Sequence, residues 1–153
     1  MNLYNNHYFF IFIVLLSSDA FGDFDFNSKF REMSSSERRE FIIGLPIDEQ
    51  VGCYIQGLMA VRPPDLSLAD AVASNGEKII VFLEDRLRAE RSDVIKLHLI
   101  DVFYRMERDG FYMVSEDAAV MSLLSEQVSI IEDSYWRGLA QRKLELIKGS
   151  GAR

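Results

Sequence analysis

The stretch Ser92–Glu107 reads SDVIKLHLIDVFYRME and decides the fold. Its apolar residues recur at three- and four-residue spacing, which places them on one face of a helix. This face contains Ile95, Leu99, Val102, Phe103 and Met106. A second apolar face contains Leu97, Ile100 and Tyr104. The two faces predict a helix packed on both sides and more buried than any other, with Lys96 on its exposed surface.

The segments on either side also have helix-end signals. Ser34 and Glu37 form a capping box ahead of a short helix that Gly44 ends. Pro46 suits the first turn of the next helix, which Pro63-Pro64 stops. Further helices are expected over residues 67–74, 77–88, 115–131 and 136–148. Ser67 and Ser115 are the caps expected for two of them.

The fold class follows from what these segments share and from what they lack. No segment shows sustained alternation of apolar and polar residues, and no Asn-Gly or Asp-Gly turn joins two strand-like runs. A length of 153 residues suits one domain. The sequence therefore predicts an all-α fold, a single compact domain of about five to seven short antiparallel helices.

One pair of predicted helices resembles a known repeat architecture. Its first helix has Ile79, Phe82, Leu83 and Leu87 on one face, and Ser92-Asp93-Val94-Ile95-Lys96 opens the second, more apolar helix. Glu77–Met106 thereby resembles HEAT-like helical repeats, and Ser115–Ile147 does so loosely. Lys96 stands near the position where that family usually has arginine. The resemblance implies stacked helix pairs and a protein-binding surface.

The N-terminal segment is typical of a signal peptide. Tyr8–Leu16 is an unbroken apolar run of nine residues, too short to span a bilayer as a helix. Ala20 and Gly22 are small residues at the spacing that a signal peptidase requires before a cut ahead of Asp23. Because residues 1–7 contain no Lys or Arg, a buried element of a cytosolic domain is the alternative.

These features divide the chain into four parts. We expect a signal peptide at 1–22, a loosely ordered lead-in at 23–34, the helical domain at 35–148 and a tail at 149–153. The mature protein is then exported, to the periplasm or outside the cell, and has no stable membrane span.

Export has a direct test. Protein recovered from an export-competent host should begin at or near Asp23, because the peptidase cuts after Gly22. Intact-mass measurement of the exported fraction checks the new N-terminus. Recovery of full-length protein with Met1, in the cytoplasmic fraction only, would contradict the prediction.

Composition excludes several classes of function. The formal net charge of −7 disfavours a nucleic-acid binder, since affinity for phosphates comes from Lys and Arg. Cys53 is the only cysteine, so an intramolecular disulfide and a zinc-thiolate cluster are both impossible. The acidic pairs Glu84-Asp85 and Glu132-Asp133 lack calcium-loop spacing, and phosphate-binding glycine loops are absent. We therefore expect no metal and no cofactor.

Few residues could carry chemistry. His98, Asp101 and Arg105 lie on one strip of the central helix, where a histidine oriented by a carboxylate could act as an acid or base. The favoured alternative is an ordinary ion pair between Asp101 and Arg105, with His98 at the rim of the core. Cys53 aligns with Gly57 and Ala60, small residues that more simply allow a neighbouring helix to approach. We assign no catalytic residue.

Tyr135, Trp136 and Arg137 form the one concentrated set of residue types that are enriched at the centres of protein interfaces. They are the candidate partner-binding residues, although Trp136 also fits a core anchor of the last helix. The expected function is that of an exported, non-enzymatic protein that binds a protein partner, for example an immunity or inhibitor protein. The alternative is a small exported enzyme that uses His98 with acidic residues.

Overall fold

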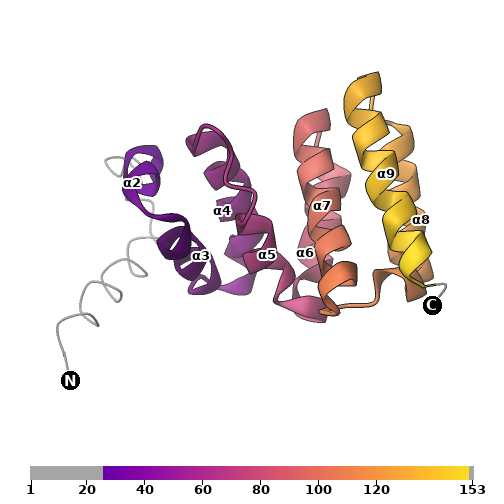
Figure 1. Ribbon diagram of the computed structural model, residues 1–153, viewed down its shortest axis with the longest axis horizontal. Helices are drawn as coiled ribbons and strands as arrows, with labels where there is room; N and C mark the ends of the chain where they lie inside the picture. The colour runs from indigo at the N-terminus through magenta and orange to yellow at the C-terminus, as the bar shows by residue number, and fades with distance from the viewer. Residues whose placement is uncertain (1–25, 152–153) are drawn as a thin grey trace.

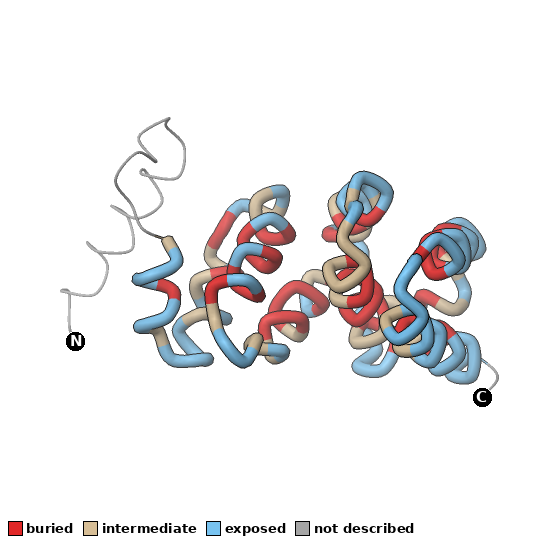
Figure 2. Tube along the Cα trace, turned by 90° about the horizontal axis from the view of Figure 1, so that it is seen from above, coloured by how far each residue is buried: buried red, intermediate tan, exposed pale blue. Residues whose placement is uncertain are grey.

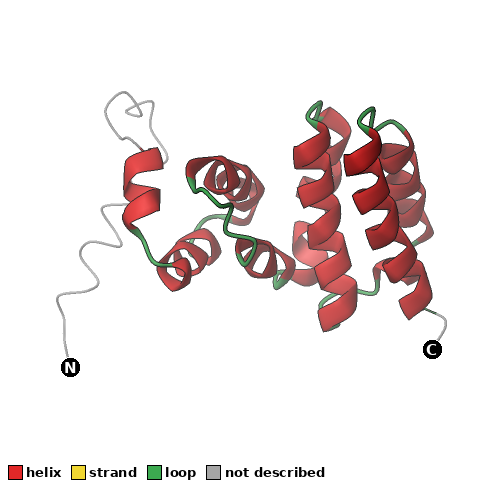
Figure 3. Ribbon diagram, turned by 45° about the horizontal axis from the view of Figure 1, so that its top comes forward, coloured by secondary structure: helices red, strands yellow, loops and turns green. Residues whose placement is uncertain are grey.

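The computed structural model describes residues 26–151, which form helices and no strands (Figure 3). The eight α-helices of this part are α2 (Phe26–Glu32), α3 (Ser35–Ile43), α4 (Ile47–Ala60), α5 (Leu68–Ala73), α6 (Ile80–Ala89), α7 (Asp93–Asp109), α8 (Ala118–Ser129) and α9 (Ser134–Ser150). Two 3-10 turns, η1 (Gly76–Ile79) and η2 (Val114–Glu116), precede α6 and α8. The predicted all-α single domain is confirmed, with one helix more than the expected range.

The helices follow one another along the long axis of the molecule as successive pairs in chain order (Figure 1). α3, α5, α7 and α9 pack successively against one another in one row, and α2, α4, α6 and α8 do so in a second row. The most extensive contact joins α7 to α9. The domain is therefore a stack of helix pairs, while membership of the HEAT-like repeats stays a prediction.

The central position of α7 is confirmed. Leu99, Val102 and Phe103 are fully buried, and α7 has more buried residues than any other described helix. Figure 2 shows the buried positions where neighbouring helices face one another. The Ser92 hydroxyl caps the helix by accepting from the Ile95 N–H, and Gly110 ends it in the left-handed conformation, with φ of 71°. The start predicted at Ser92 is therefore correct.

The prediction that Lys96 is exposed was wrong. Only 5 % of this residue is exposed, because the loop between α8 and α9 and the side chain of Trp136 lie beside it. A lysine can bury its methylene stem and keep its ammonium at the edge of the covered surface. The helical pattern alone contained no information about which segment would cover this side of α7.

The helix starts show where sequence signals succeed and fail. The capping box is confirmed, since the Ser34 N–H donates to Glu37 Oε2 at 2.7 Å and the Glu37 N–H donates to Ser34 Oγ at 3.3 Å. Ser115 was the wrong cap for α8, because Asp117 accepts from the first N–H groups of that helix. The Ser115 N–H and hydroxyl instead donate to Glu107, each at 2.9 Å. Ser67 makes no side-chain cap.

The lead-in and tail predictions need correction. Residues 26–32 form α2, since Phe26 and Phe30 stand one helical turn apart and stack with ring centroids 4.9 Å apart. Phe30 is buried against the domain. At the other end α9 continues to Ser150, so the tail begins later than expected. The predicted signal peptide at 1–22 lies outside the described residues.

The predicted role of small residues in α4 holds at Gly57. A Cβ atom built there would lie 2.7 Å from Phe30 Cε1 and 3.2 Å from Leu68 Cδ1. The missing side chain of Gly57 therefore makes the space that the Phe30 ring fills. Since Phe30 carries the packing of α2, Gly57 determines whether α2 can dock on α4.

Two glycines of α4 should respond in opposite directions to alanine. Gly52→Ala should stabilise the protein by about 0.5 to 1 kcal/mol, because alanine favours a helix and a Cβ there meets nothing within 4 Å. Gly57→Ala should destabilise it by about 1 to 3 kcal/mol through overpacking against Phe30. Urea melts of both variants measure the difference. Equal gains at the two positions would show that α2 does not depend on this contact.

Candidate functional site

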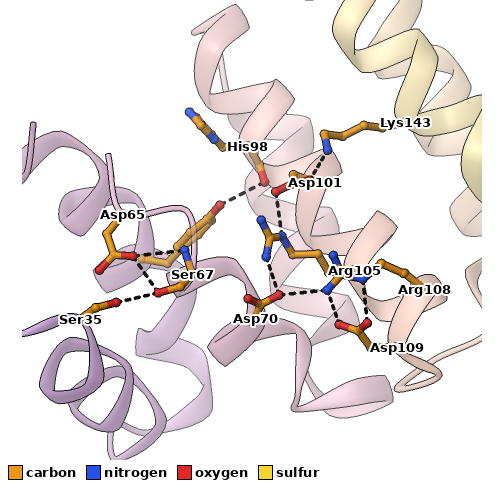
Figure 4. A network of polar contacts seen from close by, with 11 residues as sticks. Ser35, Asp65, Ser67, Asp70, His98, Asp101, Arg105, Arg108, Asp109 and Lys143 are labelled. Carbon is orange, nitrogen blue, oxygen red and sulfur yellow. Dashed lines mark hydrogen bonds and ion pairs between the residues drawn. The ribbon is translucent and has the colours of Figure 1, made fainter. Parts of the chain in front are cut away.

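A network of charged side chains joins three helices of one row (Figure 4). The Arg105 Nε–H of α7 donates to Asp101 Oδ2 at 2.9 Å, and the same guanidinium pairs with Asp70 of α5. Asp101 also pairs through Oδ1 with Lys143 of α9. Only 8 % of the Asp101 side chain is exposed. The carboxylate is therefore held between two cations, and the network ties α7 to both of its neighbours in the row.

His98 stands outside this network. Figure 4 shows its ring directed away from Asp101, while its backbone carbonyl accepts a hydrogen bond from the Tyr54 hydroxyl at 3.2 Å. Burial lowers the pKa of His98, nearby Asp101 raises that pKa, and Lys143 lowers it. Because the Asp101 carboxylate is turned to Arg105 and Lys143, it does not orient the imidazole. The geometry favours the ion-pair interpretation of this strip over the catalytic one.

Cys53 is buried in α4. Burial raises the pKa of its thiol to about 12, and the charge of Glu49 adds to the shift. The thiol is therefore protonated at neutral pH, whereas a nucleophilic cysteine needs a lowered pKa. The packing interpretation of Cys53 is favoured.

Two loops meet at one end of the stack. The connections between α6 and α7 and between α8 and α9 lie at the same end (Figure 3). Asp93, at the start of α7, accepts from the backbone N–H groups of Glu132 and Asp133 at 3.0 and 2.9 Å. Asp133 in turn caps α9 by accepting from the N–H groups of Tyr135 and Trp136. These bonds fix the second loop against the first.

A groove of about 340 Å³ lies between the two loops. We call it the Trp136 groove. Its lining residues are Arg91, Asp93, Val94, Lys96, Ile130, Glu132, Asp133 and Trp136. Ile130 is 49 % exposed, and Trp136 is half-buried and packs partly against the core. The groove thus combines apolar walls with charged residues of both signs.

The three predicted partner-binding residues, Tyr135, Trp136 and Arg137, lie in different environments. Trp136 packs against the core and also lines the groove. Tyr135 is 65 % exposed, and its ring meets Trp136 edge to face with centroids 4.8 Å apart. Arg137 is exposed and donates to the Ile131 carbonyl at 3.4 Å. Two residues of the groove lining were not predicted as binding residues: Ile130 matched no motif, and Lys96 was predicted to be exposed.

No known protein family, curated protein or solved structure matches this chain. Within residues 26–151 no helix has the length and apolar content needed to cross a membrane. In the same part of the chain no three His, Cys, Asp or Glu side chains gather as a metal-ligand set.

Proposed function

We propose that this protein is exported and acts without enzymatic activity, by binding a protein partner through the Trp136 groove and the adjoining ring of Tyr135. An immunity or inhibitor protein that neutralises a toxin or hydrolase outside the cytoplasm is the concrete form of this proposal. The exported location rests on the N-terminal segment, and the binding role rests on the groove.

One observation carries the binding role: aromatic and aliphatic side chains remain exposed together at the end of the stack. Tyr135 and Ile130 are each about half exposed or more, and Trp136 stands between the core and the groove. Aromatic anchors ringed by polar groups are the arrangement found at the centres of protein interfaces. The loops that present them are fixed by Asp93, so little ordering is needed when a partner binds.

Affinity capture tests the proposal. Mature protein, residues 23–153, is immobilised and exposed to an envelope extract of the native host. Ile130→Asp should weaken retention of the captured partner by at least about 30-fold, the equivalent of a hot-spot loss of about 2 kcal/mol. Because Ile130 is 49 % exposed, this change leaves the core intact. Titrating the identified partner against both proteins by calorimetry gives the ratio of dissociation constants.

His98→Gln is the matched control. His98 lies on α7, outside the groove lining, so partner affinity should change by less than about twofold. A partner that binds Ile130→Asp as tightly as the wild type would place the binding surface elsewhere. If a hydrolytic activity of the purified protein disappeared in His98→Gln, the enzyme alternative would replace the proposal.

A further inference from the structure

The connection between α7 and α8 carries two exposed apolar side chains. It lies at the end of the stack opposite the Trp136 groove (Figure 3). Phe111 is 43 % exposed and Met113 is 45 % exposed. This end of the stack therefore presents apolar surface to solvent.

Contacts with the core hold this connection in place. Val114 is fully buried, and the Ser115 N–H and hydroxyl both donate to the Glu107 carboxylate at 2.9 Å. The Phe111 N–H donates to the Met106 carbonyl at 3.0 Å. A surface held in this way loses little conformational entropy when a partner covers it.

A groove of about 600 Å³ lies beside the connection. We call it the Tyr112 groove. Its lining residues are Tyr112, Met113, Glu116, Asp117, Ala118 and Ala119. The Tyr112 hydroxyl donates to Asp117 Oδ2 at 2.6 Å, which holds the ring against the start of α8. Apart from its two acids the lining is aromatic and aliphatic, so the groove is suited to an apolar side chain.

The Tyr112 groove has negative charge in excess. Glu116 is exposed and Asp117 is half-buried, and none of the described residues that line the groove is Lys or Arg. Hydrogen bonds from Tyr112 and from the N–H groups of Val120 and Ala119 lower the pKa of Asp117, so its carboxylate is ionised at neutral pH. The positive end of the α8 dipole offsets only about half a charge.

The surroundings of Tyr112 are also negative. The hydrogen bond to Asp117 and burial raise the pKa of Tyr112 to about 12, and the charges of Asp117, Glu77 and Glu84 add to the shift. In residues 26–151 no Lys or Arg lies over the Tyr112 ring, although aromatic rings attract cations. The groove therefore combines apolar walls with a potential that favours a cation.

We infer that the Tyr112 groove binds a segment of a protein partner in which an Arg or Lys stands next to a large apolar side chain. The cation pairs with Glu116 and Asp117, and the apolar side chain covers Met113. The net charge of −7 attracts such a basic partner at longer range. This surface is separate from the Trp136 groove, so the inference goes beyond the proposed function and does not depend on it.

The observations favour this occupant over three others. An acidic segment would meet Glu116 and Asp117 as like charges. A divalent metal ion needs several oxygen ligands, and in residues 26–151 no three His, Cys, Asp or Glu side chains gather as such a set. A small amine would pair with the acids but leave Met113 exposed, whereas a segment with an apolar side chain also covers it.

Heteronuclear NMR spectroscopy tests the inference. The probes are two blocked peptides, acetyl-Gly-Leu-Arg-Gly-amide and its citrulline counterpart, which has nearly the same shape without the charge. They are titrated into the isotope-labelled protein. The Arg peptide should shift the amide resonances of residues 111–119 saturably and bind at least about fivefold more tightly than the citrulline peptide. Raising the salt concentration should reduce this preference.

Three variants assign the binding to the groove. Glu116→Gln should lower the preference to about twofold or less, and it leaves the fold intact because Glu116 is exposed and forms no ion pair in the described part of the chain. Glu126→Gln is the matched control, with the same change of net charge at an exposed position of α8 outside the groove lining. It should keep the fivefold preference. Met113→Ser should weaken binding of both peptides by about threefold or more through lost apolar contact.

Equal affinity of the wild type for the two peptides would overturn the inference, as would the absence of saturable shifts at millimolar concentration. An undiminished preference in Glu116→Gln, or an equal loss in Glu126→Gln, would overturn it too, and wild-type affinity of Met113→Ser for both peptides has the same consequence. Shifts centred on residues 130–136 would place the Arg peptide in the Trp136 groove and also overturn it. None of these results touches the proposed function, which fails only if Ile130→Asp retains the captured partner.

Discussion

Leu99→Ala and Phe103→Ala are each expected to lower the free energy of unfolding by about 2 to 5 kcal/mol. Both side chains are fully buried in α7, which packs on α5 and α9 within its row. Truncation removes the transfer free energy of the side chain and leaves a cavity that the neighbouring helices fill only in part. A domain of ordinary stability, about 5 to 15 kcal/mol, would lose a large share of it.

Denaturant melts of these variants measure the loss, with Arg142→Ala as the control. Arg142 is exposed on α9, so its replacement should change the stability by no more than about 0.5 kcal/mol. Lys96→Ala, the control that the sequence alone suggested, is unsuitable because Lys96 is buried. Similar small losses for Leu99→Ala, Phe103→Ala and Arg142→Ala would mean that α7 is not the centre of the core.

Asp101→Asn is expected to lower the free energy of unfolding by about 3 kcal/mol, at the lower end of the range for a broken buried ion pair. The substitution keeps the shape of the side chain but leaves Arg105 and Lys143 without the carboxylate that they share. The loss stays at the lower end because Arg105 also pairs with Asp70. Lys143 can turn partly to water, since its side chain is less buried than that of Asp101.

A second carboxylate serves as the control for this change. Asp85 is exposed and forms one ion pair, with Arg88 at 3.6 Å, so Asp85→Asn should cost less than about 0.5 kcal/mol. Adding Lys143→Met to Asp101→Asn should recover part of the loss, because it removes an uncompensated charge. Thermal or urea melts of the wild type, Asp101→Asn, Lys143→Met and the double variant give the coupling free energy between the two residues. Strict additivity would show that Asp101 and Lys143 do not interact.

The sequence by itself determined the fold class and most of the core. The spacing of apolar residues depends on the geometry of a single helix, so the two buried faces of α7 could be read directly. The positions of α8 with helical apolar spacing, Val120, Leu123, Leu124 and Val128, are buried. The capping box at Ser34 and the glycine at 110 were also predictable, because their bonds join residues close in the chain.

The cap of α8 and the formation of α2 have local sequence signals, but each also depends on contacts with residues of other helices. Ser115 and Asp117 are both good capping residues, and Asp117 became the cap because Ser115 is bonded to Glu107 of the preceding helix. The turn from Phe26 to Phe30 has helical spacing. Whether this segment packs as a helix depends on the space that the missing side chain of Gly57 leaves for Phe30, and Gly57 lies in another helix.

The candidate site was decided by the tertiary structure. Whether Asp101 orients His98 or pairs with Lys143 depends on where α9 packs, and Lys143 is 42 positions further along the chain. The Trp136 groove exists because Asp93 binds the backbone of residues 132 and 133, which brings Ile130 and Trp136 beside Lys96. Helical periodicity reports which face of a helix is apolar, but the partner of that face is set by contacts between distant segments.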